Sequence, residues 1–138
     1  MIYKRISQLA NMQRRLIDKL AKEKQYSGTE GKVIHFLFEN SGKPVYQKNI
    51  ESVFALRAAT ATQVLDSLEK QELIERVPSK EDKRLKEIVL TKKADKLKDD
   101  IFHDLNQLES QIVRGLSEAQ LHAWCEITNQ MIQNLQEE

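Results

Sequence analysis

The sequence predicts a mostly helical fold with a small β hairpin, which places it in the α+β class. The chain has 138 residues, of which 40% are hydrophobic and only four are Gly and two are Pro. Apolar residues recur at helical spacing through most of the chain, and two short runs rich in Ile and Val follow its midpoint. Domains commonly contain about 100–200 residues, so we expect residues 1–138 to form a single domain.

The first third of the chain is expected to form two helices. Apolar residues between Ile2 and Leu20 recur at helical spacing and predict a long amphipathic opening helix. Ser27 and Glu30 have the spacing of a capping box, in which each side chain bonds a free backbone N–H at a helix start. The second helix is expected to begin there and to end near Gly42.

Two further helices are expected before the hairpin. A short third helix places Ile50, Val53 and Phe54 on its inner face. A fourth helix is predicted over residues 57–72, and its inward-facing residues are Ala61, Val64, Leu65 and Leu68. The joint between these two helices is short, at Ala55-Leu56, as in the turn of a helix-turn-helix unit.

The hairpin is predicted from residues 73–78 and 86–91, which are short and rich in Ile and Val and are separated by a charged stretch. Thr91 can cap a long helix that follows and extends to Ile112. Ser117 and Gln120 form a second capping box and open the last helix.

Three short helices followed by a two-stranded wing constitute a winged helix-turn-helix core, which we place at residues 30–91. The helices in residues 1–25 and 92–138 carry apolar stripes that have no partner in so small a core. Burial against a second copy of the chain is the simplest solution, so we expect these segments to be dimerisation helices.

Charge is unevenly distributed, although the chain as a whole has a net charge of +1. Residues 1–24 have a net charge of +5, residues 43–94 of +3 and residues 95–138 of −6. The basic first segment and the acidic last segment could attract one another within one chain or across a dimer, or both could be solvated helix faces.

Taken in order, these segments resemble the MarR family of transcriptional regulators. The resemblance is densest from Thr60 to Ala94, and includes a recognition helix, a D-x-R wing motif at Asp82-Lys83-Arg84 and the pair Leu90-Thr91. It implies a homodimer that binds double-stranded DNA at a pseudo-palindromic site and regulates transcription as a repressor or an activator. As a repressor, the protein would be relieved by a small-molecule effector.

The chain departs from the family pattern at three places. Glu72 and Ala94 each stand where the family usually has Gly, and Arg57-Ala58-Ala59 stands where a polar cap is commoner. Because Gly permits a positive φ after a helix, Glu72 suggests a different end for the recognition helix.

The DNA-binding residues expected on the recognition helix are those that a 100° step places outward, near its start. Gln63 can contact adenine through two hydrogen bonds, and the Thr62 methyl can meet a thymine methyl. The complete set expected here is Arg57, Ala59, Thr60, Thr62 and Gln63.

The wing is expected to supply basic side chains to the DNA, namely Lys80, Lys83, Arg84 and Lys86. Arg84 is the first candidate for insertion into a minor groove, where negative potential is concentrated. Asp82 would be repelled by phosphate, so we assign it a bracing role in the wing. Lys43, Lys48 and Arg76 are weaker candidates for contacts with the DNA backbone.

No enzyme, metal site or cofactor is expected. The sequence has no nucleophile elbow and no phosphate-binding loop. Its candidate metal ligands form only incomplete pairs on helices, which are His35 with Glu39, His103 with Gln107, and His122 with Cys125. A metal-sensing relative of the family and a winged-helix protein-interaction module without DNA binding remain the alternatives.

Cys125 is the single cysteine and is expected to be a core residue. The aromatic residues Tyr3, Tyr26, Phe36 and Phe38 could line an effector pocket, although a place in the core is expected for each. The sequence has no apolar run of membrane-spanning length and no signal-peptide pattern, so we expect a cytoplasmic protein with no membrane partner.

Overall fold

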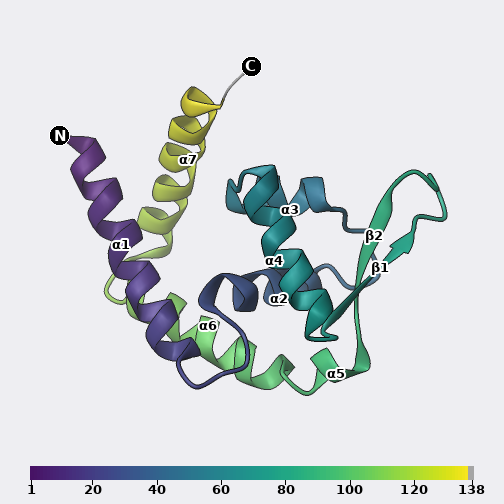
Figure 1. Ribbon diagram of the computed structural model, residues 1–138. Coiled ribbons are helices and arrows are strands. Elements are labelled where there is room, and N and C mark those ends of the chain that lie inside the picture. Colours follow the sequence, from purple (N-terminus) through teal and green to yellow (C-terminus); the bar gives the residue numbers. More distant parts are fainter. Residues whose placement is uncertain (137–138) are drawn as a thin grey trace.

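The computed structural model describes residues 1–136, and its elements form a winged helix flanked by long helices (Figure 1). The predicted class, mostly helical with a small β wing, is confirmed. In chain order the elements are α1 (Ile2–Ala21), α2 (Gly28–Glu39), α3 (Gln47–Phe54), α4 (Ala58–Lys70), β1 (Ile74–Pro78), β2 (Lys86–Leu90), α5 (Lys92–Asp95), α6 (Lys98–Val113) and α7 (Glu118–Leu135).

Both predicted capping boxes are present. Ser27 Oγ accepts from Glu30 N at 3.2 Å, and Glu30 Oε1 accepts from Ser27 N at 2.8 Å. Ser117 Oγ accepts from Gln120 N at 3.1 Å, and Gln120 Oε1 accepts from Ser117 N at 2.9 Å. These local bonds fix where α2 and α7 begin.

The helix-turn-helix joint depends on a left-handed residue. Ala55 ends α3 with φ 50° and ψ 44°, and Leu56 N donates to Glu51 O at 2.9 Å. Arg57 then returns to extended backbone as the N-cap of α4. The turn therefore needs only two residues to redirect the chain between the two helices.

The wing is an antiparallel hairpin in which Ile74 lies opposite Leu90 and Pro78 lies opposite Lys86. The hairpin is joined to the segment before α3, because Ile88 N donates to Val45 O at 2.8 Å. The wing is thus held to the segment before α3 by a backbone hydrogen bond.

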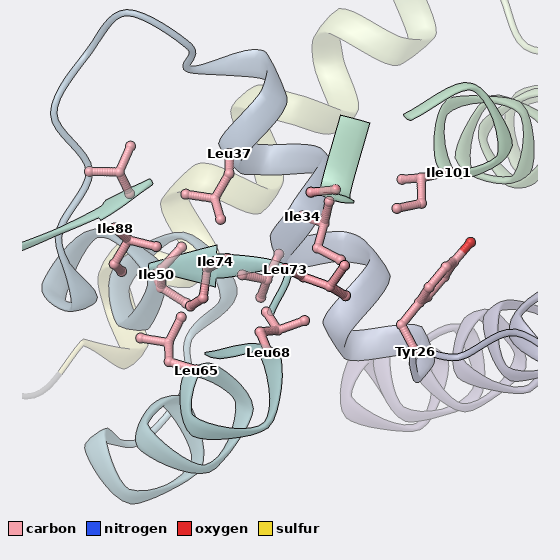
Figure 2. Close-up of a cluster of buried hydrophobic side chains, with 13 residues drawn as sticks. Tyr26, Ile34, Leu37, Ile50, Leu65, Leu68, Leu73, Ile74, Ile88 and Ile101 are labelled. Carbon is pink, nitrogen blue, oxygen red and sulfur yellow. The ribbon is translucent and has the colours of Figure 1, made fainter. Parts of the chain in front are cut away.

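The core lies between α2, α3, α4, the hairpin and α6, whose apolar side chains converge in Figure 2. Ile34, Ile50 and Leu65 are fully buried. The prediction for Val53 was wrong, because its side chain is 54% exposed. Ile50 and Phe54, four residues apart, turn α3 so that Val53 lies beyond the edge of the contact.

The prediction of one long helix after Thr91 was also wrong. Thr91 Oγ1 caps only the short α5, by accepting from Ala94 N at 3.3 Å. Leu97 N then bonds Ala94 O at 2.9 Å, three residues back, and α6 begins after this tighter turn. A single such turn barely changes the apolar spacing, so periodicity could not reveal it.

The long helices α1 and α7 are largely uncovered. Ile17 is the one buried residue of α1, and within its described residues α7 has none. The apolar side chains left exposed on the two helices include Ile6, Leu9, Met12, Trp124, Ile127 and Ile132. Within residues 1–136, no helix is both long and apolar enough to cross a membrane.

Candidate nucleic-acid interface

The outer face of α4 is open along its first turns. Ala61, Leu65 and Leu68 are fully buried and fix which face of the helix points inward. The sequence-predicted residues all lie on the exposed side: Arg57, Ala59, Thr60, Thr62 and Gln63. Arg57 makes no side-chain cap bond, so its guanidinium is not used to start the helix.

The outer face of α4 also contains acidic groups, and these are engaged by the wing. Arg76 on β1 forms an ion pair with Asp66 and a second one with Glu69 at 3.4 Å. The hydrogen bond that Arg76 donates to Asp66 is the main reason why the pKa of Arg76 is raised above its ordinary value. Arg76 therefore braces α4 against the wing. Its contact with the DNA backbone stays a prediction.

At the wing tip, Arg84 and Asp82 form a two-point contact. Arg84 Nε lies 3.1 Å from Asp82 Oδ1 and Arg84 Nη2 lies 3.0 Å from Asp82 Oδ2. Asp82 Oδ1 also accepts from Arg84 N at 3.0 Å. The Arg84 side-chain bonds, followed by this backbone bond, hold the pKa of Asp82 below its ordinary value. The carboxylate thus shapes the tip, while the Arg84 side chain remains 89% exposed.

The three lysines of the predicted set are exposed around the tip: Lys80, Lys83 and Lys86. Among the described residues, none of the three forms a salt bridge. Figure 1 shows the loop between β1 and β2 projecting away from the helices, which leaves this basic tip accessible. Lys43 and Lys48, the weaker candidates, are also exposed.

Two groups that sequence reasoning missed hold the base of the wing. Ser79 is only 2% exposed, and its Oγ accepts from Glu81 N at 3.2 Å. Tyr46 Oη lies 2.8 Å from the same Ser79 Oγ. A serine two residues before a charged turn is a local signal for such a bond, but nothing local indicates Tyr46.

A third missed group, Glu30, links the start of α2 to the end of α4. The residue is 8% exposed, and its Oε2 accepts from Ser67 Oγ at 2.7 Å and from Gln71 Nε2 at 2.9 Å. The capping box predicted the bond of Oε1 to Ser27, but the contacts of Oε2 join segments about forty residues apart.

The end of α4 has a left-handed residue, although glycine is absent there. Glu72 adopts φ 63°, in the left-handed region that glycine favours. The expectation of a different helix end was therefore wrong. Thr91, which follows β2, donates from Oγ1 to Glu72 O at 2.6 Å, and this bond helps to hold the turn.

The histidines and the cysteine lie apart. His35 Nδ1 is 3.2 Å from Glu39, while His122 Nε2 is 2.8 Å from Glu126. Within residues 1–136, no group of three potential metal ligands comes together. Cys125 is exposed, contrary to the core position predicted for it, because α7 has no covering partner in a single chain.

The aromatic residues are divided between core and surface. Tyr26 is buried, Phe36 and Phe38 are half-buried against the core, and Tyr3 is 59% exposed, which contradicts its predicted place. Tyr26 lines a cavity of about 20 Å³ between α1, α2 and α6. A larger groove of about 570 Å³ lies elsewhere, between the wing and the segment before α3.

Comparison with known proteins identifies this arrangement. The pattern of the MarR family matches residues 32–86. The chain is 31% identical to the transcription regulator MarR from Oenococcus oeni, covering 96% of this chain and 99% of that protein, with a TM-score of 0.88. The chain belongs to the MarR family. No curated protein matches it.

More distant MarR-like structures share the fold. MepR of S. aureus in a DNA complex is 20% identical, covers 98% of both chains and has a TM-score of 0.84. A putative MarR regulator from Listeria monocytogenes, complexed with a 26mer DNA, is 19% identical, covers 98% of this chain and 89% of its own, and has a TM-score of 0.85. Both of these structures therefore share the winged-helix fold of this MarR-family chain.

Proposed function

We propose that this MarR-family protein is a homodimeric, sequence-specific repressor that binds a pseudo-palindromic operator. The observation that carries the proposal is the open first half of α4 beside an exposed basic wing tip. The DNA complexes of MepR and of the Listeria regulator, which share this fold, support it. The protein has a non-enzymatic role and acts in the cytoplasm.

In this proposal each α4 enters a major groove and each wing meets the neighbouring minor groove. Gln63 reads adenine, Thr62 meets a thymine methyl, and the small Ala59 permits close approach to the bases. Arg57 and Thr60 contact bases or phosphates at the start of the helix. On the wing, Arg84 enters the minor groove, and Lys80, Lys83 and Lys86 contact phosphates, while Asp82 holds the tip in shape.

The dimer in this proposal is formed by the long terminal helices. Their exposed apolar side chains, such as Leu9, Trp124 and Ile127, form stripes that a second copy can bury. Segments of net charge +5 at the start and −6 at the end also suit an antiparallel exchange of arms between two copies.

An effector that relieves repression would act where an arm meets the core. The buried Tyr26 hydroxyl has no hydrogen-bond partner among the described residues, and it lies beside the small cavity. That cavity holds about one water molecule, so a ligand must widen it. Widening would displace the start of α2, and the hydrogen bond between Glu30 and Ser67 would transmit this displacement to α4.

A salt titration of binding to operator DNA, selected from a random library, tests the function. Affinity should fall steeply and linearly on a logarithmic scale as salt rises, since phosphate neutralisation releases counterions. Arg84→Ala should weaken binding by about 1–3 kcal/mol, and Gln63→Ala should relax the base preference. Arg114 is an exposed arginine on the arm, and Arg114→Ala is the matched control. It should change neither the affinity nor the base preference. Failure to enrich any sequence would contradict the proposal.

A further inference from the structure

Gln47 contacts the recognition helix from outside it. It is the first residue of α3 and is half-buried. Its side-chain Nε2 donates to Thr62 Oγ1 at 2.9 Å and lies 3.4 Å from Ala58 O. One amide group of α3 thus contacts two successive turns of α4, at the part of that helix which stays exposed.

This contact changes what Thr62 can do. A threonine hydroxyl within a helix can donate to the carbonyl oxygen three or four residues back, which includes Ala58 O for Thr62. Gln47 Nε2 lies close to both that carbonyl and the hydroxyl oxygen. Because Thr62 Oγ1 accepts from Gln47, the hydroxyl proton is left for another acceptor, and one side-chain rotamer is favoured.

We propose that Gln47 is a positioning residue that determines specificity, acting through Thr62. The inference rests on the proposed DNA-binding function and adds a residue to it. With the amide in place, Thr62 presents the same hydroxyl and methyl groups to one base pair of each half-site. Without the amide, Thr62 can turn back to the Ala58 carbonyl, and the preference at that base pair is lost.

The readout separates this role from a purely structural one. A residue that only stabilises α3 or contacts phosphate weakens binding to all sequences equally, because phosphate contacts carry no sequence information. Replacement of a residue that acts through Thr62 changes the preference at a single base pair. The same replacement has no further effect on that preference when the Thr62 hydroxyl is already absent.

The experiment compares Gln47→Met, which keeps the side-chain length but cannot donate, with Thr62→Val, which keeps the shape but lacks the hydroxyl. The double variant and Gln47→Ala, a second removal of the amide, complete the set. Gln107→Met makes the same change at an exposed position of α6 and is the control. Each variant selects from a half-site library, and its affinity is measured for operators with single base-pair changes. Thermal unfolding verifies that each variant is folded.

We expect Gln47→Met, Gln47→Ala and Thr62→Val to lose about tenfold in discrimination at the same base pair, since each of them removes the same specific base contact. The double variant should lose no more than either single variant. Three results in both Gln47 variants would overturn the inference but leave the proposed function standing. They are a uniform loss of affinity, a loss of discrimination at a different base pair, and an unchanged base preference. A wild-type protein that enriches no sequence overturns the proposed function together with it.

Discussion

The winged core and the helical arms of this protein bury their apolar residues to very different extents. In the core, Val33, Ile50 and Leu65 are fully buried by neighbours from the same chain. In the arms, Leu9 is 48% exposed and Trp124 is 54% exposed. The core therefore buries its apolar side chains within one chain, whereas those of the arms become buried only when another surface covers them.

The largest expected effect tests the independence of the core. Leu65→Ala removes a fully buried side chain from α4 and should lower the free energy of unfolding by about 2–5 kcal/mol. Chemical denaturation measures this change. The control is Val53→Ala, at a 54% exposed position of α3, which should stay within about 0.5 kcal/mol of the wild type. Equal losses from the two variants would contradict the burial pattern described above.

The next prediction concerns the arms. Leu9→Glu places an unpaired charge on the exposed stripe of α1, and burial of such a charge is strongly unfavourable. We expect the dimer dissociation constant to rise about 100-fold or more, as a loss of about 3 kcal/mol implies. Sedimentation equilibrium measures it. Leu85→Glu, at an exposed position of the wing, should leave the dimer intact, and a monomeric wild-type protein would refute the role given to the arms.

Tyr26 lies where the two regions meet, and its titration should report on that junction. Burial, and then Asp104 and Asp100, raise the pKa of Tyr26 to about 12. Between pH 10 and 12 the unfolded chain releases this proton and the folded chain keeps it. Stability should therefore fall by about 1.4 kcal/mol per pH unit across that window. Below pH 10 the effect is absent, because both states are protonated.

Tyr26→Phe should remove this pH dependence. It should also stabilise the protein by about 1 kcal/mol at neutral pH, because it deletes a buried hydroxyl with no partner among the described residues. Thermal unfolding at a series of pH values measures both effects. Superimposable curves for the variant and the wild type would show that Tyr26 does not titrate as described.

The smallest expected effect refines the description of the core. Glu72 adopts φ 63° at the end of α4, which is unfavourable for any residue with a Cβ atom. Glu72→Gly should therefore stabilise the core by about 1 kcal/mol. Glu75→Gly, in the extended backbone of β1, is the control and should destabilise it. If both variants lose stability, the Glu72 side chain stabilises the fold by more than its left-handed backbone destabilises it.

Features set by neighbours in the chain were predictable from the sequence, and features set by distant contacts were not. The capping box of Ser27 with Glu30 and the hairpin pairing of β1 with β2 involve residues that are close in the chain. The contacts of Arg76 with Asp66 and of Gln47 with Thr62 join different elements, and no local pattern indicates them.

The errors have a similar cause. A periodic pattern predicts that a residue is apolar and faces one side, but it does not predict what covers that side. Cys125 and Tyr3 were therefore expected in the core, although both lie on arms that this chain alone leaves exposed. The outward residues of α4 were predicted well, because Ala61 and Leu65 mark the opposite face.

The Glu30 carboxylate has a consequence for how this sequence can change over evolutionary time. One buried group accepts hydrogen bonds from Ser27, Ser67 and Gln71, so the effects of substitutions at these four positions cannot be additive. Replacement of Glu30 alone removes the acceptor of the Ser27 backbone N–H and of the Ser67 and Gln71 side chains, while coordinated replacements can also remove the two side-chain donors. Descendants of this chain should therefore vary at these sites as a set, and the pattern of co-substitution would record the contact between α2 and α4.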